Sequence, residues 1–403
     1  MIKRNLYDIC FSEDFGRQMR FVAGPRQAGK TTLAKKFLNK NQFDKLYFSW
    51  DFRSTRIAYQ KDPEFYQQTL LNLQPTKTPW ICFDEIHKYP KWKDILKEIY
   101  DKHGELYRFI ITGSARLDLF RKSGDSLIGR FFLFKLFPFA LNEITEKNRP
   151  RDDHLLDQEG FLNKRISNVK YDQDVMENLL KFSGFPDPFL AQKEAFHKKW
   201  RNTYIDRLIH DDLKEISQVS DLENVSRLML LLPEKIGSPL SVNSLREDML
   251  VSYNALKNYL YLLELVYIFF KVDSYSKNIS RSIKKEKKLY FFDWTHISDH
   301  AKRFENYVAV ELKSLIEIWN DGGHEFELYY LRTRDGKESD FLLVKDKHPW
   351  LIIEVKSTRQ KIERHHYTSA KKLGNIPVLQ IVRENNIVEK HENGYQVSAS
   401  RFF

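Results

Sequence analysis

Three short apolar runs near the start of the chain each end in small or polar residues. They are RFVA at 20–23, WICF at 80–83 and RFII at 108–111. Continuous apolar runs of this length are typical of strands that are buried on both faces of a parallel sheet. The first run is soon followed by an amphipathic helical segment, TTLAKKFL, which begins at Thr31. The pattern predicts an α/β fold with a parallel sheet in the N-terminal part of the chain.

The middle of the chain changes to a helical period. The segment 241–269 predicts two helices, the second of which buries one apolar face. The buried face of this second helix is predicted to carry Leu256, Tyr259 or Leu260, and Leu263. Its outward face is predicted to carry Asn254, Lys257 and Asn258. With the aromatic run that follows near 290, this indicates a helix-turn-helix with a wing, whose outward polar groups can enter a DNA major groove. The alternative is a unit that packs against the N-terminal domain and transmits its state.

Farther along, an amphipathic helix with Glu305 and Glu311 precedes three strand-like runs, FELYYLRT, ESDFLLV and WLIIEVK. Because residues i and i+2 of a strand share a face, Glu354 and Lys356 are expected to converge near Asp340. Two carboxylates can bind Mg²⁺ there, and an amine can orient a water or offset the charge of a phosphate. The pattern therefore predicts Asp340 and Glu354 as metal ligands and catalytic groups, with Lys356 as the catalytic amine.

The turn after the first apolar run carries GPRQAGKT, which fits the phosphate-binding pattern G-x-x-x-x-G-K-[ST]. Two glycines let the backbone curl, so that its N–H groups point at phosphate oxygens. Lys30 then meets the β and γ phosphates, and Thr31 places its hydroxyl on Mg²⁺, at the positive end of the following helix. No N-K-x-D run accompanies the motif, so we expect ATP rather than GTP. The predicted nucleotide-binding residues are Gly24, Pro25, Arg26, Gln27, Ala28, Gly29, Lys30, Thr31 and Thr32.

The second and third apolar runs end in residues that suit the same chemistry. Asp84 is predicted to hold Mg²⁺ from the side opposite the loop, and Glu85 to deprotonate the attacking water. This pair is typical of a hydrolase rather than a small-molecule phosphotransferase. Thr112 and Ser114 follow the third run and are placed to sense the γ phosphate. A turn or helix-capping role is equally compatible with either hydroxyl.

Taken together, these motifs resemble a family of AAA+-like ATPases that carry a C-terminal nuclease-like domain of the PD-(D/E)XK type. The matching stretches are GPRQAGKT, ICFDEIHKYPKW, ITGSARLDL, SLIGRFFLFKLFPFALNEI, FSGFP, FENYVAVEL, ESDFLL and IIEVKS. The resemblance implies a P-loop ATPase domain at 1–150, a helical and winged-helix-like region at 151–290, and a restriction-endonuclease-like α/β domain at 291–403. The proline of the nuclease motif is replaced by Ser339, at a position that carries no ligand.

The resemblance also makes Arg130 the first candidate for an arginine that stabilises charge on the γ phosphate, with Arg116 as the second. Such an arginine acts either on its own nucleotide or on that of a neighbouring copy, so a homo-oligomer is among the expected partners. His87 and the pair His365 and His366 lack partners at metal-ligand spacing, and we expect them to be structural or solvated.

Composition and charge limit the class of protein, its partners and its compartment. The 403 residues are 42% apolar and 30% charged, which is typical of a soluble protein of two or three domains. Its net charge of +11 favours a polyanion such as DNA as partner. Six Lys or Arg residues fall within the loop at 277–288, which either contacts a phosphate backbone or keeps the protein soluble. With only two cysteines and no long apolar stretch, we expect a cytoplasmic protein without a membrane span.

Two functions of different class agree with these features. In the first, ATP binding and hydrolysis gate a DNA-processing nuclease module. In the second, the protein is an ATP-dependent switch whose C-terminal module only binds nucleic acid or a protein partner. ATP and Mg²⁺ are the expected cofactors of both.

Overall fold

The computed structural model describes residues 2–113, 127–145, 155–167, 172–213, 221–276, 286–333, 335–391 and 394–403. The chain forms two compact units. The N-terminal unit holds residues 4–138 together with 265–267, and the C-terminal unit holds 1–3, 139–264 and 268–403. The first predicted boundary, at 150, therefore lies about a dozen residues beyond the observed one. Within the described ranges, no helix is both long and apolar enough to cross a membrane.

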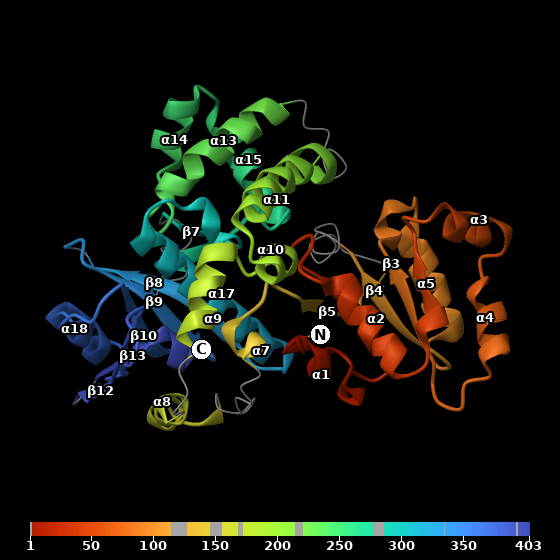
Figure 1. Ribbon diagram of the computed structural model, residues 1–403, viewed down its shortest axis with the longest axis horizontal. Coiled ribbons are helices and arrows are strands. Elements are labelled where there is room, and N and C mark those ends of the chain that lie inside the picture. The colour runs from red at the N-terminus through yellow and green to blue at the C-terminus, as the bar shows by residue number, and fades with distance from the viewer. Residues whose placement is uncertain are drawn as a thin grey trace. The chain divides into compact units, whose positions relative to one another are not determined.

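The N-terminal unit is built on a five-stranded sheet with the strand order β2-β3-β4-β1-β5, in which every neighbouring pair is parallel. The strands are β1 (Met19–Ala23), β2 (Tyr47–Ser49), β3 (Trp80–Asp84), β4 (Arg108–Thr112) and β5 (Phe131–Lys135). All five residues of β1 and of β3 are buried, so the continuous apolar runs predicted these strands correctly. The helices of this unit are α1 (Leu6–Cys10), α2 (Lys30–Lys40), α3 (Arg53–Lys61), α4 (Tyr66–Leu73) and α5 (Trp92–His103) (Figure 1).

The register of this sheet decides which polar residues meet. Asp84 at the end of β3 is paired with Ser49 of β2 and Thr112 of β4, and Thr112 is paired in turn with Val22 of β1. These strands therefore end at one edge, where the loop at 24–29 follows β1. The start of β5 lies at the other edge, because Phe131 is paired with Met19.

The C-terminal unit begins with a helical region. Its helices are α7 (Leu141–Ile144), α8 (Gln158–Ile166), α9 (Gln173–Phe182), α10 (Pro186–Ala191), α11 (Glu194–Arg207), α13 (Leu222–Lys235), α14 (Val242–Met249) and α15 (Tyr253–Leu265). Helices α14 and α15 occupy the segment in which two helices were predicted. The predicted faces of α15 are also correct, because Leu256, Leu260 and Leu263 are buried while Asn254, Lys257 and Asn258 are exposed.

An eight-stranded mixed sheet completes this unit, with the order β12-β13-β11-β10-β9-β8-β6-β7. Its strands are β6 (Phe269–Ser274), β7 (Lys288–Phe291), β8 (Phe326–Arg332), β9 (Glu338–Lys345), β10 (His348–Lys356), β11 (Val378–Val382), β12 (Val388–His391) and β13 (Gly394–Ser398). Its helices are α17 (His300–Asp321), α18 (Arg364–Lys372) and α19 (Ala399–Phe402). Strands β6 and β7, in the region of the predicted wing, pair antiparallel, and β6 also pairs with β8, so both belong to this sheet. The winged-helix assignment stays a prediction. The predicted domain boundary at residue 290 falls within strand β7, because β7 pairs with β6 in this sheet.

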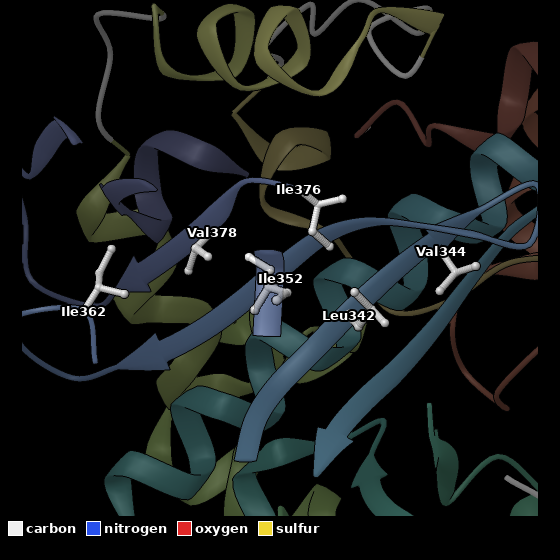
Figure 2. Close-up of a cluster of buried hydrophobic side chains, with 7 residues drawn as sticks. Leu342, Val344, Ile352, Ile362, Ile376 and Val378 are labelled. Carbon is white, nitrogen blue, oxygen red and sulfur yellow. The ribbon is translucent and has the colours of Figure 1, made fainter. Parts of the chain in front are cut away.

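A buried apolar cluster holds one face of this sheet together. Figure 2 shows Leu342 and Val344 of β9 beside Ile352 of β10, with Ile362, Ile376 and Val378 around them. Ala370 of α18 belongs to the same cluster. Because side chains alternate along a strand, Asp340 continues the face of Leu342, and Glu354 continues the face of Ile352. The two predicted metal ligands thus lie at the end of a hydrophobic face, where Glu354 is buried and Asp340 is partly buried.

Candidate nucleotide site and carboxylate cluster

The loop between β1 and α2 has the backbone that a phosphate-binding loop requires. Gly24 has φ of 137°, and a side chain there would clash with the carbonyl oxygen of Leu136, so only glycine fits. Gly29, with φ of 99°, precedes the first turn of α2. Lys30 lies across the loop, and its Nζ donates to the carbonyl oxygens of Gly24 (2.9 Å) and Pro25 (2.7 Å). The lysine is therefore held at the place where phosphates would bind.

The rest of the predicted loop lies between β1 and the first turn of α2. Gln27 adopts the left-handed region with φ of 61°, which tightens the turn. The carbonyl oxygen of Ala28 accepts a hydrogen bond of 2.7 Å from the guanidinium of the buried Arg4. Motif reasoning did not find Arg4, since its role follows only from the tertiary fold. Arg26 lies in this loop, and Thr32 lies in the first turn of α2.

Asp84 is the meeting point of this site. The hydroxyl of Thr31 donates to its Oδ1 (3.2 Å) and lies 3.4 Å from its Oδ2, and the hydroxyl of Thr112 donates to Oδ1. Tyr47 of β2 also donates to Oδ2, at 2.5 Å. The structure therefore brings together Thr31, Asp84 and Thr112 as predicted. Tyr47 was not predicted, because no motif marks the short strand on which it lies.

These oxygen donors suit Mg²⁺. A hydroxyl and a carboxylate in contact are the ligand types that this ion takes in phosphate-binding sites, where waters and phosphate oxygens complete its shell. Over the described ranges, no group of three or more His, Cys, Asp or Glu side chains is arranged to hold a metal ion. The site thus fits an ion held mainly by Thr31, Asp84 and the nucleotide itself.

Glu85 follows Asp84 in a strained conformation that turns it away from the strand. Its φ is 57°, and its N–H donates to the carbonyl oxygen of Thr112 (2.8 Å). Burial raises the pKa of Glu85 to about 7, although Lys88 and Lys30 act in the opposite direction. A carboxyl that titrates near neutral pH suits a general base. His87 is buried, with Nε2 3.3 Å from Glu85 Oε2, so it is a structural neighbour of the site.

The predicted arginine does not join this site within one chain. The carbonyl oxygen of Arg130 accepts from the N–H of Met19 (2.9 Å), at the edge of the sheet opposite the loop. Its guanidinium pairs with Asp101, with Nε 2.7 Å from Oδ1. Within one chain Arg130 therefore lies away from the nucleotide loop, and its action on the nucleotide of a neighbouring copy stays a prediction. Ser114 and Arg116 lie outside the described residues.

A second group of charged residues occupies the C-terminal unit. The Oδ2 of Asp340 accepts the N–H of Val355 (2.8 Å), which ties β9 to β10. Lys356 Nζ lies 2.6 Å from Glu354 Oε1, and Tyr290 donates to Glu305 Oε1 (2.7 Å). Together with Lys288 and Glu338, described next, these residues form what we call the carboxylate cluster: Lys288, Glu305, Glu338, Asp340, Glu354 and Lys356.

Burial dominates the electrostatics of this cluster. Burial, followed by repulsion from Glu354, raises the pKa of Asp340 to about 7. Burial and then Asp340 raise the pKa of Glu305 to about 8. Burial also raises the pKa of Glu354, while its hydrogen bond from Lys356 opposes the rise. Such mutually raised values are typical of carboxylates that share one site.

Lys288 is a residue that sequence reasoning placed wrongly. The sequence places it in a basic loop that either contacts a phosphate backbone or is solvated, yet it is only 2% exposed and its Nζ lies 3.1 Å from Glu338 Oε2. Burial alone lowers the pKa of Lys288, but the nearby Glu305, Asp340 and Glu338 outweigh it and raise the pKa overall. The neighbouring Lys287 pairs with Asp273 at 2.7 Å. Lys284 and Lys285 lie outside the described residues.

The other nearby side chains have supporting roles. Ser339 Oγ shares a hydrogen bond of 2.8 Å with Nδ1 of His366, whose Nε2 lies 3.4 Å from Glu354 Oε2. Burial, with the charges of His365 and Lys356, lowers the pKa of His366 to about 3, so its ring is neutral at ordinary pH. Glu311 accepts the N–H of Leu141 (2.8 Å) and thereby caps α7.

Three family models match the chain. Residues 16–145 match one described as an AAA domain, 173–298 match a domain of unknown function (DUF8612), and 301–402 match a domain of unknown function (DUF4143). The first match supports a P-loop ATPase of the AAA class in the N-terminal unit, as the loop and Asp84 predict. The other two models name no activity, so the nuclease-like assignment stays a prediction.

Two relatives and two solved structures that resemble this chain each share a quarter or less of its sequence. An uncharacterized protein of Methanocaldococcus jannaschii is 25% identical over 393 residues, which cover 92% of this chain and 82% of that one. An uncharacterized protein of Haemophilus influenzae is 23% identical over 314 residues, with 73% and 74% covered. The Aeropyrum pernix ORC1 protein in complex with DNA shares 14% identity at a TM-score of 0.30, covering 76% of this chain and 91% of that one. The Thermotoga maritima RuvB Holliday junction branch migration motor shares 16% identity at a TM-score of 0.31, with 67% and 90% covered.

Proposed function

We propose that the protein binds ATP with Mg²⁺ at the loop after β1 and hydrolyses it. The observation that carries this proposal is the contact of Thr31 with Asp84, in a site that also holds Lys30 and a partly buried Glu85. Bound Mg²⁺ supplies positive charge to the phosphates and would be held by Thr31 and Asp84. Lys30 contacts the β and γ phosphates in place of its present carbonyl partners.

Glu85 then acts on the attacking water. It accepts a proton as the water oxygen bonds to the γ phosphorus, and the bond from that phosphorus to the ADP oxygen breaks. The products are ADP and inorganic phosphate, with the proton left on Glu85. A pKa near 7 lets Glu85 accept this proton and release it again at neutral pH.

Two substitutions separate binding from hydrolysis. Lys30→Ala is expected to abolish tight ATP binding, whereas Glu85→Gln is expected to keep binding and lose at least about 100-fold in hydrolysis. Titration with a fluorescent ATP analogue and a phosphate-release assay measure the two effects. Glu98→Gln, on the exposed face of α5, is the matched control and should behave as wild type. Hydrolysis at the wild-type rate by Glu85→Gln would show that another group is the base.

We further propose that ATP hydrolysis gates the C-terminal unit, which cleaves DNA with the help of Mg²⁺. Asp340 and Glu354 would hold the ion, which supplies a Lewis acid to a phosphodiester. The fit rests on Glu354, whose buried Oε2 has no hydrogen-bond partner among the described residues. Lys356, paired with Glu354 Oε1, is placed to offset charge on the phosphate. The exposed Asn254, Lys257 and Asn258 of α15 support DNA as the partner.

A nicking assay on plasmid DNA with Mg²⁺ or Mn²⁺ tests this second step. Asp340→Asn is expected to abolish nicking through loss of the metal, while Lys356→Met is expected to keep metal binding and lose catalysis, because an ammonium is not a ligand. ATP hydrolysis should survive both changes. DNA binding without nicking under every metal and nucleotide condition would favour the alternative, an ATP-dependent switch whose C-terminal unit only binds.

A further inference from the structure

The carboxylate cluster contains its own buried cation. Lys288 lies in β7, where its backbone pairs with Val272 of β6 on one side and with Pro239 on the other. Its ammonium lies 3.1 Å from Glu338 Oε2 and 5.3 Å from the centre of the Tyr330 ring. Because the side chain is 2% exposed, its charge stays inside the cluster rather than in solvent. Strand pairing on both sides fixes its position.

The cluster is divided between its two lysines. Lys356 is paired with Glu354 at one end, and Lys288 is paired with Glu338 at the other. The second oxygen of Glu338 lies 3.4 Å from Arg332 Nε, and Glu305 Oε1 accepts from Tyr290. The side of Glu305 and Glu338 is therefore already compensated by positive charge and hydrogen bonds. On the other side, the buried Glu354, only 5% exposed, keeps Oε2 without a hydrogen bond among the described residues, and the neutral ring of His366 lies 3.4 Å from it.

We propose that Lys288 is a resident cation that limits the cluster to one divalent metal ion. This inference rests on the proposed metal site at Asp340 and Glu354. One ion held by two carboxylates, with waters and substrate oxygens completing its shell, fits the open side. A second ion, at the roughly 4 Å spacing of two-metal sites, would need Glu305 or Glu338, where Lys288 lies.

Charge acts in the same direction as space. Lys288 places a positive charge beside Glu305 and Glu338, and Arg332 adds a second one next to Glu338. A divalent ion at that position would be repelled at short range by the buried ammonium. Removal of Lys288 leaves Glu305 beside Asp340 without this cation, which makes both space and negative charge available for a second ion.

Counting bound Mn²⁺ tests the proposal on the full-length chain without nucleotide. Free Mn²⁺ is measured by electron paramagnetic resonance, and the ions at the cluster are those lost on Asp340→Asn. We expect one such ion in wild type and two in Lys288→Met, with the first ion bound at least about tenfold more tightly in the variant. Lys288→Arg, which keeps the charge, should bind one.

The outcomes separate this inference from the proposed function. Two ions at the cluster in wild type, or one in Lys288→Met, would overturn the role of Lys288 and leave the metal site itself intact. No ion at the cluster in wild type would overturn both. Thermal unfolding and ATP hydrolysis show whether Lys288→Met is folded, and Lys288→Gln replaces it if it is not. A wild-type count of two overturns the role of Lys288 without any variant, and a wild-type count of one makes the count in the folded Lys288 variant the deciding result.

Discussion

The charges around Glu85 should set the pH at which ATP hydrolysis rises. Removal of the charge of Lys88 tests this prediction most simply. Glu85 must be ionised to accept a proton, so kcat/KM should be low below its pKa, rise about tenfold per pH unit and level off above it. In the wild type this inflection is expected near pH 7. Lys88→Met removes a positive charge that favours the ionised form, so the inflection should move to higher pH.

The expected size follows from the geometry. Two unit charges at the 3.6 Å between Lys88 Nζ and Glu85 Oε2 interact by roughly 4 to 5 kcal/mol at an effective dielectric constant of about 20. The Lys88 side chain is 32% exposed and also pairs with Asp51 at 2.6 Å, so screening and this shared charge reduce the interaction to roughly 1 kcal/mol. At about 1.4 kcal/mol per pH unit, the inflection should rise by about 0.7.

The assay is phosphate release at low ATP concentration between pH 5.5 and 9, with wild type and variants measured in the same buffers. Lys88→Arg keeps the charge and serves as the matched control, with an unmoved inflection. Asp51→Asn removes a negative charge that raises the pKa of Glu85, so its inflection should move to lower pH. An inflection that stays in place in both Lys88→Met and Asp51→Asn would refute Glu85 as the titrating base.

Two further predictions concern the carboxylate cluster and Arg130. Because the pKa of Asp340 is about 7 in the folded chain and about 4 when unfolded, the free energy of unfolding should fall as pH rises between these values. Asp340→Asn should therefore be more stable than wild type by about 4 kcal/mol at pH 8 without divalent ions and similar at pH 4, and an equal Tm difference at both pH values would contradict this. If Arg130 acts on a neighbouring copy, mixing Arg130→Ala with Lys30→Ala chains should restore part of the ATP hydrolysis. No rescue, with a rate per chain that is independent of concentration, would remove that role.

The sequence predicted those parts of the fold and site that depend on local pattern. Apolar runs marked β1, β3 and β4, and their ends marked Asp84 and Thr112, because parallel strands bring their carboxyl ends to one edge. The period of α15 gave its buried and exposed faces correctly. The strand alternation that places Glu354 on one face with Lys356 was likewise readable from spacing alone.

The other features of the fold and the site depend on strand pairing between distant parts of the chain, which residue spacing does not reveal. Lys288 follows a run of basic residues that is typical of an exposed loop, yet the pairing of β7 with β6 carries it into the cluster. Tyr47 reaches Asp84 only because β2 lies beside β3. Arg130 follows a glycine in a suggestive motif, but the parallel pairing of β5 with β1 places it at the wrong edge for its own nucleotide.

The most direct test of the account is whether ATP hydrolysis controls the C-terminal unit. Plasmid nicking with Mg²⁺ should be measured without nucleotide, with ATP and with a non-hydrolysable ATP analogue, for wild type, Glu85→Gln and Asp340→Asn. The account predicts that ATP changes the nicking rate of wild type, that Glu85→Gln with ATP behaves as wild type with the analogue, and that Asp340→Asn does not nick. A nicking rate that is the same under all three nucleotide conditions, in a protein that hydrolyses ATP normally, would contradict it.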